Sequence, residues 1–278
     1  MVRPTLSRAC TLPYHFVRVS ADRQRIYVTE SSGERLVRVF DPAGKPLGFF
    51  NAPSVDASTR QPMYVLSDQS KRLFVSDRKA EAVQVFGSDG QYTGELPLPP
   101  GAERWAPLGL GTDRLGQIYV IEAGNNVHRV LVYDEQLRFK RQFGASGSRP
   151  GELSFANALA VDAKGRVFVS NGNNSRIEVF GPDGSLLINY GNDGSLGGSG
   201  LLRGIALDEQ NRLHVVDSLG HMVEVFNADS PAKDPMFTFG GFGLGDGRFR
   251  FPNGLAIDAA GRIYVADREN DRVQVWAY

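Results

Sequence analysis

Residues 261–267 read GRIYVAD, and this pattern of alternating apolar residues that ends on an acid or an amide occurs six times along the chain. The other five copies are QRIYVTE at 24–30, KRLFVSD at 71–77, GQIYVIE at 116–122, GRVFVSN at 165–171 and NRLHVVD at 211–217. Their last residues are spaced by 47, 45, 49, 46 and 50 positions. Six units of this length account for all 278 residues, so the sequence predicts one domain, 1–278, built from repeats.

Each repeat is expected to contain four strands. The quoted segment is followed by a second alternating run that ends on an aromatic residue, such as VQVW at 273–276, and is preceded by an apolar run joined to it by a turn such as DAAG at 258–261. A further turn, such as PDGS at 182–185, leads into a fourth run, LLINY at 186–190. Alternation with a period of two is typical of strands, and Asp and Gly in short connections are typical of hairpin turns.

Six four-stranded antiparallel units without a helical pattern predict an all-β fold, the six-bladed β-propeller. The last unit ends after its third strand, so residues 3–9 are expected to supply its outer strand and to close the ring. The expected blades cover about 12–52, 60–97, 105–144, 156–191, 203–240, and 253–278 together with 3–9.

Composition excludes several classes of protein. The chain has 31 basic and 31 acidic residues, so its formal net charge is zero and no global field attracts nucleic acid or an anionic membrane. The single cysteine, Cys10, cannot form an intramolecular disulfide, and no apolar run is long enough to span a membrane. The first dozen residues lack the apolar core of a secretory signal. The compartment stays open between the cytoplasm and, if an export signal was removed, the periplasm or the extracellular space.

The best copy of the repeat, FPNGLAIDAAGRIYVAD followed by DRVQVW at 251–276, resembles the NHL repeat, and the resemblance extends over essentially the whole chain. The arginine of the NHL pattern is present as Arg129, Arg176 and Arg272, whereas the other three blades have Leu36, Ala82 and Met222 in its place. The family includes RNA-binding and protein-binding domains, sensor ectodomains and a lyase with a channel metal. The resemblance therefore implies the propeller scaffold and no single activity.

The connections between blades and the loops between second and third strands should open on one face, where binding groups are expected. Several of these connections end with an arginine or an aromatic residue, which suits a planar, anionic or peptide ligand. Asn157 and Asn253, at the start of inner strands, should face the mouth of the channel. The alternative is that these side chains only fasten neighbouring blades together. The predicted ligand contacts are Arg60, Arg104, Trp105, Asn157, Arg203, Arg250 and Asn253.

Five carboxylates and one amide end the repeated segments: Glu30, Asp77, Glu122, Asn171, Asp217 and Asp267. Carboxylates that converge could hold a hard cation. We expect instead that the repeat arginines pair with this ring of acids, and no cofactor is predicted. If a calcium or zinc ion is present in the channel, its expected ligands are Asn157, Asn253, Glu30 and Asp217. Lactonase-type propellers, which the chain resembles in architecture, hold a divalent cation with such groups.

No catalytic residue is predicted, because no nucleophile, phosphate-binding or zinc-protease motif occurs. Four scattered histidines do not indicate a zinc site, and His214 is expected in the core, where the other blades have Tyr or Phe. The leading hypothesis is a non-catalytic propeller that binds a protein or a small-molecule ligand on its loop-rich face. The alternative is a divalent-metal-dependent lyase or hydrolase at the channel mouth, and the third is a sensor or scaffold ectodomain of a larger protein. Nucleic acid is disfavoured because the interblade loops carry nearly equal numbers of arginines and acids, and the oligomeric state is left open.

Overall fold

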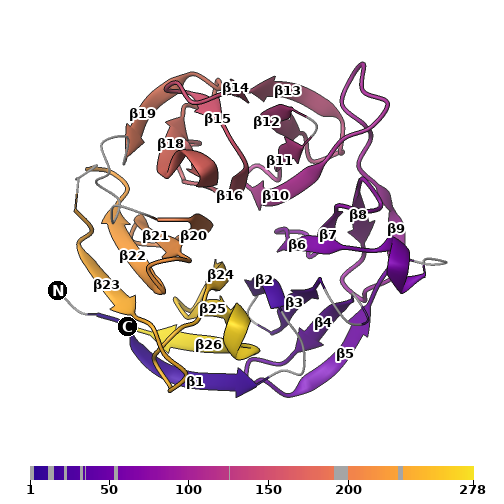
Figure 1. The fold of residues 1–278 in the computed structure, drawn as a ribbon. Helices are drawn as coiled ribbons and strands as arrows, with labels where there is room; N and C mark the ends of the chain where they lie inside the picture. The colour runs from indigo at the N-terminus through magenta and orange to yellow at the C-terminus, as the bar shows by residue number, and fades with distance from the viewer. Residues whose placement is uncertain are drawn as a thin grey trace.

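The computed structural model describes residues 3–11, 16–21, 24–31, 34, 36–52, 56–124, 126–190, 200–230 and 234–278. Their strands form six four-stranded antiparallel sheets that surround a central axis, which confirms the predicted six-bladed β-propeller (Figure 1). In the described part of the chain no helix is long and apolar enough to cross a membrane.

Each of the first five blades runs in chain order from an inner strand at the axis to an outer strand. Blade 1 contains β2 (Phe16–Ala21), β3 (Ile26–Glu30), β4 (Val37–Phe40) and β5 (Pro46–Phe50). Blade 2 contains β6 (Pro62–Ser67), β7 (Leu73–Asp77), β8 (Ala82–Phe86) and β9 (Tyr92–Glu95), and blade 3 contains β10 (Pro107–Thr112), β11 (Ile118–Gly124), β12 (Val127–Tyr133) and β13 (Phe139–Phe143). Blade 4 contains β16 (Ala156–Val161), β17 (Val167–Asn171), β18 (Arg176–Phe180) and β19 (Leu186–Tyr190), and blade 5 contains β20 (Leu202–Leu207), β21 (Arg212–Asp217), β22 (Met222–Asn227) and β23 (Phe237–Gly240).

Blade 6 joins the two ends of the chain. It contains β24 (Pro252–Ile257), β25 (Ile263–Asp267) and β26 (Arg272–Ala277), and its outer strand is β1 (Thr5–Thr11). β1 pairs antiparallel with β26 from Thr5 opposite Ala277 to Thr11 opposite Arg272. The predicted closure by an N-terminal strand is therefore confirmed, although this strand lies two residues later than expected.

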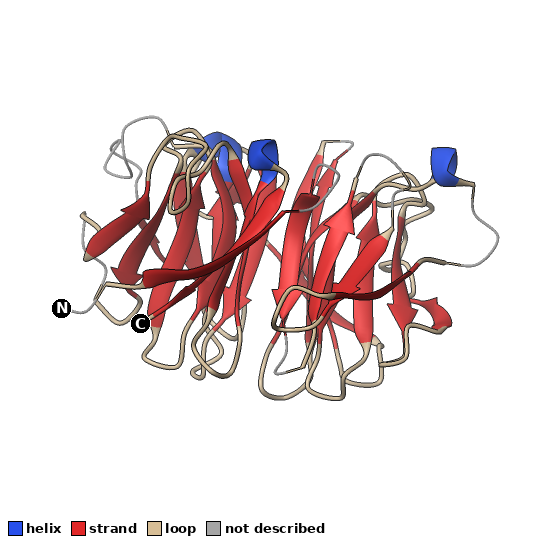
Figure 2. Ribbon diagram, turned by 90° about the horizontal axis from the view of Figure 1, so that it is seen from below, coloured by secondary structure: helices blue, strands red, loops and turns tan. Residues whose placement is uncertain are grey.

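Two faces of the ring differ in their loops. The connections between blades and the loops between second and third strands share one face, called here the upper face. The short 3-10 helices η1 (Ala57–Thr59), η2 (Gly172–Asn174) and η3 (Arg268–Asn270) all lie on this face (Figure 2). The opposite, lower face contains the short turns within each hairpin. A two-residue pairing of β14 (Ala145–Ser146) with β15 (Glu152–Leu153) orders one of the upper connections.

The aromatic position of the second strand is filled by core residues: Tyr27, Phe74, Tyr119, Phe168 and Tyr264 are all almost inaccessible to solvent. His214 occupies this position in blade 5 and is also fully buried, as predicted. Its Nε2 lies 2.8 Å from the hydroxyl of Tyr278, and burial lowers the pKa of His214 to about 4. The imidazole is therefore neutral at physiological pH and serves to pack blade 5 against the end of the chain.

On the lower face an aspartate and an arginine four residues later stabilise the turn between the first two strands of a blade. Asp162 accepts a hydrogen bond from Arg166 Nε at 2.6 Å, and Arg166 also donates to the carbonyl oxygen of Ala228 in the next blade at 3.1 Å. The same aspartate–arginine pair occurs in three other blades, as Asp68 with Arg72, Asp208 with Arg212, and Asp258 with Arg262. These carboxylates are thus committed to the fold.

The ring acids on the upper face are buried and bonded within the protein. Arg129 Nε donates to Glu122 Oε2 and Arg272 Nε donates to Asp267 Oδ2, both at 2.7 Å, so the predicted pairs are confirmed in blades 3 and 6. The prediction is wrong for Arg176, because the acid is replaced there by Asn171. Arg176 instead pairs with Glu178 and donates to the carbonyl oxygen of Ser148 at 2.7 Å.

Blade 5 has a buried acid, Glu224, at the third-strand position that Glu178 occupies in blade 4. Met222 replaces the arginine, and Glu224, only 4% exposed, has an Oε2 atom without a hydrogen-bond partner. Burial, with a smaller contribution from the charge of Asp217, raises the pKa of Glu224 from 4.5 to about 7. Glu224 therefore binds a proton more tightly in the folded than in the unfolded chain.

This shift gives a testable pH dependence. Below about pH 4.5 Glu224 is protonated in both the folded and the unfolded chain. Between about pH 4.5 and 7 it ionises in the unfolded chain but stays protonated in the folded one, so the contribution of Glu224 to stability falls as the pH rises through this window. The loss above pH 7 is on the order of 2 kcal/mol, allowing for residual solvent screening. Glu224→Gln should therefore gain stability over wild type between pH 5 and 8 in urea unfolding. A difference between the two proteins that does not change with pH would contradict the assignment.

Candidate functional site

The upper mouth of the channel is formed by one bulged residue of each inner strand. Each inner strand pairs with the second strand of its blade, and its first paired residue lies opposite the ring acid or amide. Directly after that residue the register shifts by one position, for example between Ala156 and Ala158 or between Pro252 and Gly254. A bulge of this kind re-aims the side chain of the extra residue. The residues at this position are Val17, Met63, Leu108, Asn157, Arg203 and Asn253. The side chain of Val17 lies outside the described residues, and the other five are apolar in blades 2 and 3 and polar in blades 4 to 6.

Asn157 and Arg203, both predicted ligand contacts, touch each other across two blades. Arg203 Nη1 donates to Asn157 Oδ1 at 2.6 Å, and Asn157 Nδ2 donates to the carbonyl oxygens of Phe155 at 2.9 Å and Leu202 at 3.1 Å. A Cβ atom at Gly172 would lie 2.2 Å from Asn157 Nδ2, so the glycine leaves room for this amide. The Asn157 side chain is thereby fixed, and it orients the guanidinium of Arg203.

The charge of Arg203 is not balanced at the mouth. Its side chain is half-buried, and among the described residues no carboxylate lies within ion-pair distance of it. Burial is the main cause that lowers the pKa of Arg203, and the positive charge of Arg268 adds to it. Arg268 is half-exposed in η3, and its nearest acid is Glu269, with Nη2 to Oε1 at 3.5 Å. Two guanidinium groups thus raise the positive potential at the mouth, which favours an anion there.

Three further predicted ligand contacts are not among the bulged residues of the mouth. Arg60 is buried and donates to the carbonyl oxygen of Glu34 at 2.8 Å, and exposed Arg104 pairs with Glu81, with Nε to Oε2 at 2.7 Å. Trp105 is in the core, where its ring packs against Tyr133 at a centroid distance of 6.4 Å, so it presents no surface to a ligand.

Arg250 directly precedes an inner strand, and its backbone serves the fold. Its N–H donates to Asp267 Oδ1 at 2.7 Å, while its Nη1 donates to the carbonyl oxygen of Glu269 at 3.5 Å. Residues directly before an inner strand thus mostly fasten the blades together.

Arg268 was not among the predicted contacts. The sequence signal for it is its place directly after the ring acid Asp267, in the loop that opens on the upper face.

The two acids among the possible metal ligands are bonded within the fold. Glu30 accepts hydrogen bonds from the N–H of Glu34 at 2.9 Å and from Arg38 Nε at 2.7 Å, and Asp217 accepts one from Gly220 N–H at 2.9 Å. Both carboxylates thus accept hydrogen bonds from groups of their own blades. Within the described ranges no three His, Cys, Asp or Glu side chains form a group that could hold a metal ion.

Below the mouth the channel is lined by uncharged side chains. Its cavity of about 240 Å³ is lined by the inner strands of all six blades, with Val65, Leu110 and Leu159 among the lining residues. No acid, arginine, lysine or histidine is among them. The ionisable groups that could act on a ligand in the channel are therefore concentrated at its ends.

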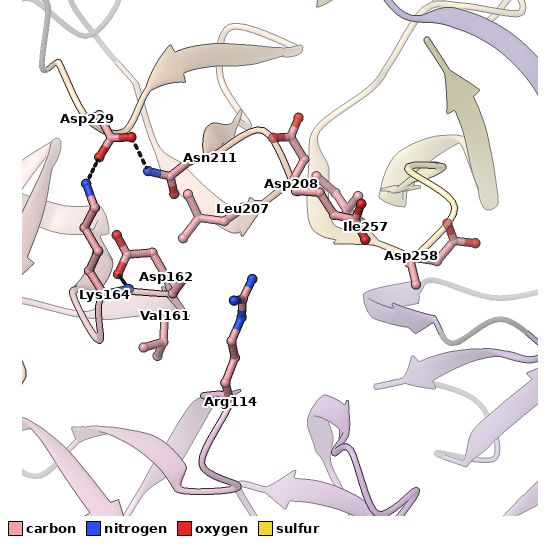
Figure 3. A pocket seen from close by; sticks show the side chains of 13 residues that line it. Arg114, Val161, Asp162, Lys164, Leu207, Asp208, Asn211, Asp229, Ile257 and Asp258 are labelled. Atoms are coloured by element: carbon pink, nitrogen blue, oxygen red, sulfur yellow. Dashed lines mark hydrogen bonds and ion pairs between the residues drawn. The ribbon is translucent and has the colours of Figure 1, made fainter.

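A second pocket, of about 390 Å³, opens at the lower end of the channel (Figure 3). Arg114 points into it, opposite the turn that contains Asp208. Lys164 Nζ and Asn211 Nδ2 both donate to Asp229, at 2.6 and 2.9 Å. Most acids of this pocket are thus already paired with basic or amide groups of the fold.

Residues 249–276 match the NHL repeat. Among curated proteins, the chain is 25% identical over 172 residues to human NHL repeat-containing protein 3, an alignment that covers 58% of this chain and 48% of that protein. It is 32% identical over 156 residues to the rat E3 ubiquitin-protein ligase TRIM71, which covers 48% of this chain and 16% of that protein. The chain thus spans about half of the first relative and a small part of the second.

Solved structures show the same fold. A streptogramin B lyase superposes with a TM-score of 0.70 and 13% identity, over 97% of this chain and 96% of that one. A luciferin-regenerating enzyme superposes with a TM-score of 0.74 and 13% identity, over 99% and 96% of the two chains. At this identity the likeness establishes the architecture alone. The six observed blades show that the chain is a six-bladed β-propeller, and its last repeat matches the NHL repeat that also gives the curated relatives their name.

Proposed function

We propose that this propeller is a binding protein whose upper channel mouth receives an anionic group of its ligand on Arg203. The single observation that supports the proposal most strongly is the half-buried guanidinium of Arg203, held by Asn157 and without a carboxylate partner among the described residues. Burial of this charge and its repulsion by Arg268 both cost free energy. An anion bound to Arg203 would recover part of that cost through charge-assisted hydrogen bonds.

The shape of the mouth suggests how such a ligand would lie. Arg203 and Asn253 provide polar groups on one side, while Met63 and Leu108 provide an apolar wall in blades 2 and 3. A ligand with one anionic end and an apolar body fits this division, since a small number of polar groups in an otherwise apolar site fixes the orientation of the ligand. The channel below has no charged side chain among its lining residues.

The same geometry weighs against a divalent cation held by Asn157. The Oδ1 atom of Asn157 already accepts a hydrogen bond from Arg203, and the guanidinium would repel a cation at the same place. A lyase or hydrolase that depends on such an ion is therefore the less favoured function, although enzymes such as the streptogramin B lyase share the fold.

The proposal predicts a specific loss of anion binding. Arg203→Gln keeps a donor for Asn157 but removes the charge, and should weaken binding of citrate, succinate or inorganic phosphate about tenfold to a hundredfold. Calorimetric titration of the full chain at low salt measures this effect. Arg114→Gln, at the lower pocket, is the matched control and should bind as wild type does. Equal affinity in wild type and Arg203→Gln, or loss only in Arg114→Gln, would overturn the proposal.

A further inference from the structure

Two connections on the upper face have the same backbone and different side chains. The segments 144–155, before blade 4, and 240–251, before blade 6, are equal in length and each doubles back through a parallel contact, β14 with β15 in the first and Phe242 with Phe249 in the second. Gly147 N–H donates to the carbonyl oxygen of Leu153 at 3.0 Å, and Gly243 N–H donates to that of Phe249 at 3.1 Å.

The blade that follows each segment also holds it in the same way. Asn174 Nδ2 donates to the carbonyl oxygen of Gly147 at 2.9 Å, and Asn270 Nδ2 donates to that of Gly243 at 3.0 Å. Arg176 and Arg272 occupy equivalent positions, and each donates to two or more carbonyl oxygens of its segment. The shared backbone is thus maintained by polar groups of the blades, so both segments present their outward side chains on an ordered support.

At the outward positions the first segment has Ser146 and Ser148, and the second has Phe242 and Leu244. The Phe242 and Leu244 side chains are 67% and 69% exposed. Ser146 Oγ donates to the carbonyl oxygen of Asn126 at 2.7 Å, whereas the Phe242 ring rests on His221 with a centroid distance of 5.0 Å and still stays mostly exposed. Large apolar side chains that stay exposed on an ordered loop indicate an interaction surface, and their ordering before binding reduces the entropic cost of association.

The charge beside the apolar pair differs as well. Arg248, which is exposed, stands where the first segment has Glu152. Among the described residues its guanidinium makes one hydrogen bond, from Nη1 to the carbonyl oxygen of Gly240 at 3.3 Å. We call Phe242, Leu244 and Arg248 the blade-6 shelf.

We infer that the blade-6 shelf docks a segment of a partner protein that places an apolar side chain against Phe242 and Leu244 and a carboxylate on Arg248. Charge complementarity selects the carboxylate, and the aliphatic Leu244 suits an apolar side chain rather than a stacked base. This inference does not depend on the channel mouth.

The test uses a displayed library of random twelve-residue peptides, selected on the immobilised full chain. Peptides in which an acid neighbours an aromatic or aliphatic residue should be enriched. Phe242→Ser/Leu244→Ser, which copies the outward side chains of the first segment, should weaken their binding at least about tenfold, and Arg248→Glu should do the same. The matched control is Leu47→Ser/Phe49→Ser on β5, where side chains 54% and 62% exposed undergo the same chemical change; it should bind as wild type does.

Three results would overturn the inference. These are no enrichment of any peptide motif, equal binding of the enriched peptides to the Phe242→Ser/Leu244→Ser variant, and binding of a single-stranded RNA oligonucleotide that this variant alone loses. Arg203→Gln separates this inference from the proposed function. It should weaken small-anion binding about tenfold to a hundredfold and leave peptide binding intact, so either proposal can fail without the other.

Discussion

Deleting residues 1–11 is expected to destabilise the whole ring. β1 forms six register pairs with β26, and Leu6 packs against the buried apolar cluster that contains Trp276. Six lost pairs at about 1 kcal/mol each, with the apolar contact of Leu6, lower the free energy of unfolding by on the order of 5 kcal/mol or more. For a chain of this size that corresponds to a fall in melting temperature of roughly 10 °C or more, or to aggregation through the exposed edge of β26.

The control deletion removes residues 1–3 and leaves Thr5–Thr11 in place. Its melting temperature, measured by calorimetry beside wild type and the longer deletion, should match that of wild type. If the longer deletion also melted with wild type, β1 would not be the element that closes the ring.

Arg272→Met is expected to be the most damaging single substitution on the upper face. It reproduces the Met222 of blade 5, but here it leaves the fully buried carboxylate of Asp267 without its guanidinium and removes the donors to the carbonyl oxygens of Gly245 and Arg248. Removing one partner of a buried pair costs about 3–5 kcal/mol. Urea unfolding should show this loss as a lower midpoint.

Arg138→Met provides the comparison. Arg138 pairs with Asp134 at 2.8 Å on the surface, with three quarters of its side chain exposed, and such pairs contribute about 0–1 kcal/mol. Equal losses in Arg138→Met and Arg272→Met would show that the arginine of the NHL pattern does not anchor the connection between blades.

The repeat was sufficient to predict the fold, because each copy alternates with the strand period and ends on a residue with a fixed role. The spacing of 261–267 and its five relatives predicts the blades, and the short last unit predicts the closure by the N-terminus. The burial of His214 follows from its register, since the same position is aromatic in every other blade. These features depend on local pattern, which a sequence displays directly.

The candidate site was predicted only in part. Asn157 and Arg203 were predicted and lie in contact, because both sit at the start of inner strands. Trp105 lies two residues before its inner strand and not at the bulge, and its ring packs in the core against Tyr133. Arg268 was missed because its electrostatic effect on Arg203 acts between blades 5 and 6, which no local pattern encodes.

The central claim is that the upper channel mouth attracts an anion, and it is tested most directly by diffraction from crystals of the full chain soaked in bromide. Anomalous scattering locates bromide without assumptions about the natural ligand. The account predicts a bromide ion at the mouth in contact with the guanidinium of Arg203 and on the side of Arg268, and its absence from Arg203→Gln crystals. Bromide bound at other arginines, such as Arg114, with none at Arg203 would contradict the account.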